Sequence, residues 1–102
     1  MGSVPASSVP VGGGVRTTAA GSGDPVFVCQ PRAGEYVAFS GVCTHAGCTV
    51  NAPRDGAFVC PCHDSRFDAA TGKVLQGPAT APLARYRVRE EGGTVHIGTR
   101  EG

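Results

Sequence analysis

Glycine and proline interrupt this chain so often that no long helix can form in it. The 102 residues include 16 glycines and 8 prolines. Relative to alanine, each glycine costs a helix interior about 1 kcal/mol and each proline about 3 kcal/mol. Hydrophobic residues make up 40% of the chain, which is enough for a small core. We therefore expect one small all-β domain of antiparallel sheets.

Short apolar segments between glycine and proline turns predict the strands. They lie at residues 9–16, 25–30, 35–40, 56–59, 72–76, 83–89 and 94–98. The first is broken by glycines and is typical of an edge strand. Residues 1–8 are small and polar, so we expect a flexible N-terminal segment or a remnant of cloning there. The domain itself is then expected at residues 9–102.

The charge of the chain excludes two classes of partner. Nine Lys and Arg residues against eight Asp and Glu residues give a formal net charge of +1. Such a balance provides no basic field for nucleic acid and no polycationic face for a membrane surface. Apolar runs such as residues 26–29 are far shorter than the ~20 residues of a membrane span. No signal peptide is recognisable, so we expect any membrane tether to belong to a precursor.

Two short loops hold four of the five cysteines and two of the three histidines. Residues 43–48 read CTHAGC and residues 60–65 read CPCHDS. Three kinds of site fit this pattern: a zinc site, a pair of disulfides, and an iron–sulfur cluster with mixed ligands plus one disulfide.

The three kinds of site account for the loops to different degrees. A zinc site would use Cys43, His45, Cys60 and His63, but the first two are separated by one residue, where structural zinc loops usually have two to four. Two disulfides explain the even number of loop cysteines but not a histidine in each loop.

The two loops resemble the C-x-H-x-G-C and C-P-C-H-x-S boxes of the Rieske [2Fe–2S] family. The resemblance runs from about residue 9 to residue 98, because residues 77–82, GPATAP, are similar to the proline loop of that family. It implies a Rieske-type fold of small stacked antiparallel sheets with a cluster-binding loop subdomain at about 42–82. It also implies that Cys43 and Cys60 bind one iron, His45 and His63 bind the other, and Cys48 and Cys62 form a disulfide.

Formal charges show what mixed ligands would do to a cluster. Two ferric ions, two sulfides and two thiolates form a neutral core, whereas a core with four thiolates carries two negative charges. An electron is added more easily to the neutral core in a low dielectric. The resemblance therefore implies a reduction potential of roughly −150 to +300 mV, the range of Rieske centres.

Four further residues are expected beside the cluster. Ser65 matches the box serine whose hydroxyl bonds a bridging sulfide in the family. Phe67 takes the place of a common tyrosine, and its ring cannot donate a hydrogen bond, so the potential should be lower than in tyrosine-bearing relatives. Gly77 and Pro78 would cover one side of the cluster.

The remaining cysteine and histidine are not expected to be ligands. Cys29 is expected to be a buried core residue, and His96 a surface or half-buried residue.

The function that the resemblance implies is one-electron transfer, not catalysis by this chain. The partner would be a redox protein or a quinol-type donor. The alternative is a Rieske subunit of an oxidoreductase complex that either oxidises quinol or is similar to arsenite oxidase. The small subunit of arsenite oxidase also has the pair Phe-Asp after the box serine, and this chain has Phe67 and Asp68 there. A disulfide implies an extracytoplasmic location. The remaining alternative, a zinc-stapled binding module, would contain one zinc and no iron or labile sulfide.

Overall fold

The computed structural model describes residues 3–18, 23–44, 48–54, 56–62, 64–77 and 79–101. Apart from one 3-10 turn at Ala6–Ser8, its regular elements are strands, so the predicted all-β fold of small antiparallel sheets is confirmed. The strands are β1 (Ser3–Pro5), β2 (Gly14–Thr18), β3 (Pro25–Arg32), β4 (Glu35–Ser40), β5 (Ala57–Val59), β6 (Arg66–Asp68), β7 (Val74–Gln76), β8 (Arg85–Glu91) and β9 (Thr94–Glu101). Within the described ranges, no helix has the length and apolar character needed to cross a membrane.

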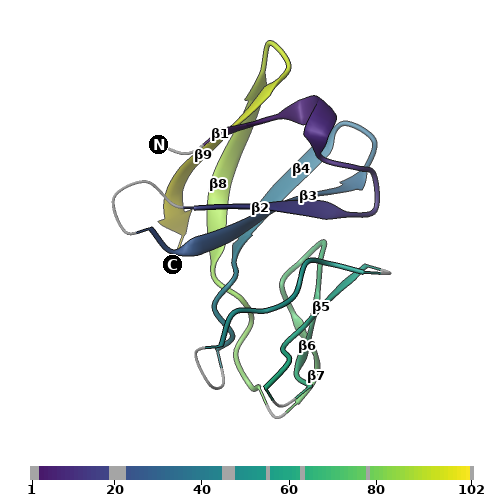
Figure 1. Cartoon of the computed structure of the whole chain (residues 1–102), viewed down its shortest axis with the longest axis vertical. Helices are drawn as coiled ribbons and strands as arrows, with labels where there is room; N and C mark the ends of the chain where they lie inside the picture. Colours follow the sequence, from purple (N-terminus) through teal and green to yellow (C-terminus); the bar gives the residue numbers. More distant parts are fainter. Residues whose placement is uncertain are drawn as a thin grey trace.

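The strands form two sheets of unequal size. The large sheet has six strands in the order β1-β9-β8-β4-β3-β2, and the small sheet has three in the order β5-β6-β7. The chain leaves the large sheet after β4 and returns to it at β8. The segment between them, residues 41–84, carries the small sheet and is called the small unit below. Figure 1 shows the small unit lying against one side of the large sheet.

Strand β3 is buried on both of its faces. Residues 26–29 form a continuous apolar run without alternation, and these four residues and the polar Gln30 are all buried. Val26 and Val28 face a core closed by β8 and β9. Phe27 and Cys29 face the opposite way, into the core shared with the small unit. One strand therefore joins both cores of the molecule.

Aromatic rings attach the small unit to the large sheet. The ring of Phe58 in β5 lies 5.5 Å from that of Phe27 and 6.1 Å from that of Phe39, between ring centroids. Gly72 approaches the same contact with a φ of +77°, and a Cβ there would lie 2.8 Å from the Phe39 ring. Only glycine fits this close approach without displacing the ring.

The structure differs from the sequence-based expectation most clearly at four elements. The strand expected at residues 9–16 begins only at Gly14 and runs to Thr18, where it pairs with β3. Ser3–Pro5 is a strand that pairs with β9 and buries Val4, where a flexible segment was expected. Strand β6 was not predicted, because three residues show no periodicity by themselves. Strand β9 continues to Glu101, beyond the expected end at Gly98. In each case the pairing partner, not the local sequence, defines the strand.

We predict that Phe58→Ala lowers the free energy of unfolding by about 3–5 kcal/mol, because it removes a fully buried ring between the two parts of the molecule. Urea unfolding followed by circular dichroism measures the change. The control is Leu75→Ala, whose side chain is 57% exposed and whose loss should change the free energy by less than about 0.5 kcal/mol. Equal effects of the two substitutions would show that the aromatic contact does not attach the small unit.

Candidate metal centre

Backbone hydrogen bonds close both cysteine loops. In the first loop, which follows β4, the N–H of Cys43 donates to the carbonyl of Cys48 at 2.7 Å. In the second, which follows β5, the N–H of Cys60 donates to the carbonyl of Ser65 at 2.8 Å, and the N–H of Asp64 donates to the carbonyl of Cys60 at 2.9 Å. Each loop thus turns back on its first cysteine.

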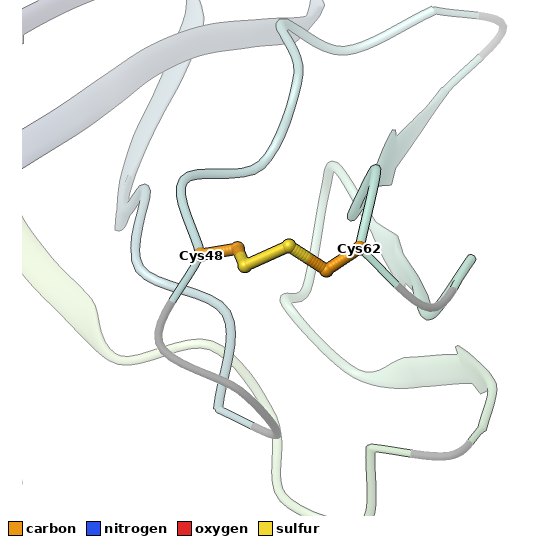
Figure 2. The surroundings of a disulfide bond; sticks show 2 residues. All are labelled: Cys48 and Cys62. Atoms are coloured by element: carbon orange, nitrogen blue, oxygen red, sulfur yellow. A yellow bond between two sulfur atoms is a disulfide. The ribbon is translucent and has the colours of Figure 1, made fainter.

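A disulfide joins the two loops to each other. Figure 2 shows the bond between Cys48 and Cys62, which are 14 residues apart in the chain. It is the disulfide that the resemblance of the two boxes implied. With it, the first and second loops cannot separate in the folded protein.

A third loop, at residues 77–82, is hydrogen-bonded to both cysteine loops. The hydroxyl of Thr44 donates to the carbonyl of Ala81 at 2.7 Å, which connects it to the first loop. The N–H of Ala79 donates to the hydroxyl oxygen of Ser65 at 3.1 Å, which connects it to the second. Each pair of the three loops therefore has its own connection.

Two thiols lie at the bases of these connected loops. Cys43 is 2% exposed and Cys60 is fully buried, and neither belongs to the disulfide. The sulfur of Cys60 lies within 4.8 Å of both disulfide sulfurs. Thiolates are the protein ligands of iron–sulfur clusters. Two buried thiols at the bases of adjoining loops fit a cluster held at these loops.

Three of the predicted site residues, His45, His63 and Pro78, lie outside the described residues. Gly77 is described and is exposed at the start of the third loop.

The side chains that pack beneath the two cysteine loops are mostly apolar. Cys43, Cys60 and Phe67 all belong to the buried cluster between the small unit and the large sheet. Phe67 is fully buried and lies opposite Phe58 across the β5–β6 pair. Ser65 is also fully buried, and its hydroxyl oxygen is satisfied by Ala79. The thiols thus lie in a region of low effective dielectric.

The remaining cysteine and histidine have the positions that the sequence predicted. Cys29 is buried in β3, and desolvation by burial raises the pKa of its thiol to about 12. It therefore stays protonated at neutral pH and is a core residue. His96 is exposed on β9.

Comparison with known proteins identifies the family. Residues 3–87 match the family model described as the Rieske [2Fe-2S] domain. The chain belongs to this family. The cofactor of this Rieske protein is accordingly a [2Fe–2S] cluster. The match confirms the membership of the Rieske family that the two boxes predicted.

Relatives of this Rieske protein differ widely in size. It is 45% identical over 100 residues to the carotenoid phi-ring synthase of Chlorobaculum tepidum, covering 96% of this chain and 15% of that protein. It is 40% identical over 75 residues to the cytochrome b6-f complex iron-sulfur subunit of Chlorobaculum thiosulfatiphilum, covering 72% of this chain and 40% of the subunit. The chain thus spans less than half the length of either relative.

A solved structure matches most of the chain. The plasma membrane Rieske protein PetC3 from the cyanobacterium Synechocystis PCC 6803 superposes with a TM-score of 0.76 at 36% identity. The match covers 85% of this chain and 87% of that one.

Sequence analysis missed the hydrogen bonds that connect the third loop. Thr44 and Ala79 were not singled out, because a threonine between box residues and an alanine beside a proline carry no distinctive signal. Asp64 was also passed over, although it is the variable residue of the second box. Only the fold reveals that its backbone has a positive φ of 59°.

We predict that replacing both bridge cysteines, Cys48→Ser with Cys62→Ser, lowers the free energy of unfolding by about 3 kcal/mol, since a crosslink across a loop of this length removes that much entropy from the unfolded chain. Urea unfolding without reductant measures it. As the control, Cys29→Ala removes a buried sulfur but keeps the bridge, so its unfolding should remain sensitive to added reductant. A double variant as stable as the wild type would contradict a bridging role.

Proposed function

We propose that this protein is a one-electron carrier whose [2Fe–2S] cluster is bound by Cys43 and Cys60 on one iron and by His45 and His63 on the other. The observation that carries the proposal is the pair of buried thiols at the bases of two loops that a disulfide joins. The imidazoles follow from the box pattern of the family. When bound, such a cluster accepts and releases a single electron.

The surrounding residues would hold the three loops in place and exclude water from the cluster. The three connections among the loops hold their relative positions, so that little of the protein has to move when the charge of the site changes. Ala79 is buried in the third loop, so this loop would cover the side of the site that faces it. Gly77 and Pro78 precede it, and we propose that these residues exclude water from the cluster.

Ser65 and Phe67 would adjust the reduction potential in opposite directions. Because the oxygen of Ser65 accepts the N–H of Ala79, its hydroxyl hydrogen remains available to donate to a cluster sulfide. Such a bond stabilises the reduced form and raises the potential. Phe67 offers no donor, so we propose a potential below that of relatives with a tyrosine there.

A second candidate is a redox subunit or domain of a larger oxidoreductase, either quinol-oxidising or similar to arsenite oxidase. It is favoured by the names and sizes of the relatives: one is a subunit of the cytochrome b6-f complex, and another is a synthase of which this chain matches 15%. In that case the electron partners would be other parts of the assembly. In the carrier proposal, the partner is a separate redox protein or a quinol-type donor.

We further propose an extracytoplasmic location, on the outer side of the cytoplasmic membrane. The disulfide supports it, because such bonds persist in oxidising compartments. The similarity to a plasma membrane Rieske protein supports it as well. Residues 42–82 would then be the cluster-binding subdomain of a domain that includes β1, since Ser3–Pro5 pairs with β9 of the large sheet.

We predict that the purified protein contains two irons and two labile sulfides and takes up one electron reversibly, with a midpoint potential between roughly −150 and +300 mV. A spectroelectrochemical titration measures the potential and the electron count. Cys43→Ser should abolish or greatly reduce cluster binding, whereas the control Cys29→Ala should retain it. Full cluster content in the Cys43 variant would overturn the proposed ligand set, and one zinc in place of iron would overturn the function.

A further inference from the structure

Asp64 has a left-handed backbone conformation, which is uncommon for residues with a side chain. Among the described residues, it is the one that combines a side chain with a positive φ, at 59°. Its backbone is held from two directions: its N–H donates to the carbonyl of Cys60 at 2.9 Å, and its carbonyl accepts from the side-chain amide of Gln76 at 3.1 Å. The left-handed conformation is therefore built into the second loop.

Glycine would adopt this conformation at lower cost. Residues with a Cβ pay a steric penalty in the left-handed region, which aspartate tolerates better than most. The side chain of Asp64 makes none of the described hydrogen bonds and ion pairs, and the residue is exposed. Its carboxylate therefore does not hold the loop in shape, in contrast to Asp68, which accepts the N–H groups of Ala70 and Thr71.

Asp64 is also the residue that directly follows His63, so its Cα lies about 3.8 Å from that of a proposed cluster ligand. The hydrogen bond to Cys60 brings its backbone back to a second proposed ligand. A carboxylate carries a negative charge at neutral pH. It is therefore placed where it opposes the addition of an electron to the cluster. The nearest cation along the chain, Arg66, is exposed at the start of β6 and offsets part of this charge.

We propose that the Asp64 carboxylate lowers the reduction potential of the cluster, and so acts as a residue that adjusts how readily this carrier accepts an electron. The inference rests on the proposed function. Its physical basis is the Coulomb interaction, which for an exposed charge several ångströms away changes the reduced-to-oxidised ratio by a factor of a few.

The experiment compares midpoint potentials of the cluster-loaded protein at pH 7 in three variants. Asp64→Asn removes the charge and keeps the size of the side chain, and Asp64→Gly removes both. Glu35→Gln removes the same charge at the exposed start of β4. Glu35 lies at the end of β4 opposite to Ser40, after which the chain enters the first cysteine loop. The five residue steps between Glu35 and Ser40 span roughly 17 Å, which exceeds the screening length of about 8 Å at physiological ionic strength.

We predict that both Asp64 variants raise the reduced-to-oxidised ratio at a fixed potential about threefold, equal to about 30 mV for a one-electron couple. The Glu35 control should leave the ratio unchanged. The difference between wild type and Asp64→Asn should shrink in 1 M salt, where charges are screened within about 3 Å. A purely structural role of Asp64 would produce no such dependence on salt.

Three results would overturn the inference: a potential of Asp64→Asn equal to that of the wild type, a shift that does not depend on salt, or a shift in Asp64→Gly without one in Asp64→Asn. The last two would assign the effect to loop conformation. Iron and sulfide content separates these outcomes from a failure of the proposed function. A wild type without iron and sulfide would overturn the function and this inference together, whereas a loaded protein with unshifted potentials would overturn the inference alone.

Discussion

The bond between Cys48 and Cys62 is the constraint on which the arrangement of the site depends. The loops that it joins are short, and each is closed by backbone hydrogen bonds to its own first cysteine. The local structure of either loop cannot fix its position relative to the other loop. The disulfide supplies that long-range connection, and the third loop strengthens it through Thr44 and Ala79.

The sheets provide what the loops lack, a fixed and apolar base. Strands β4 and β5 lead directly into the two loops, and Phe58 in β5 packs against Phe27 and Phe39 of the large sheet. The thiols of Cys43 and Cys60 belong to the same buried cluster as these rings. Electrostatic interactions between the site and nearby dipoles would therefore be strong. Small differences, such as the lack of a hydroxyl group on Phe67, would then change the reduction potential of the cluster.

Part of the site could be predicted from the sequence because the residues of each box are local. The resemblance of CTHAGC and CPCHDS to the Rieske boxes implied the disulfide pair, which the structure contains, and it supplies the ligand set, which stays a prediction. The strands at 25–30 and 35–40 were predicted because their apolar residues are continuous or bounded by clear turns. In contrast, β1 and β6 are three residues each and are defined by their pairing, β1 with β9 and β6 with β5 and β7.

The features that the sequence did not predict depend on residues far apart in the chain. The hydrogen bond from Thr44 to Ala81 joins residues that are 37 positions apart in the chain, and the local sequence at either residue does not indicate it. The positive φ of Asp64 is imposed by bonds to Cys60 and to Gln76. Such contacts hold the loops of the site in place, and because they join residues far apart in the chain, only the three-dimensional structure reveals them.

The central claim is that one iron is bound by two cysteines and the other by two histidines. Pulsed electron paramagnetic resonance of the reduced protein, with histidine labelled by nitrogen-15, tests it most directly. The account predicts strong hyperfine coupling from two histidine nitrogens, reduced to one when His45 or His63 is replaced and the cluster is still bound. A reduced cluster without any directly bound histidine nitrogen would contradict it.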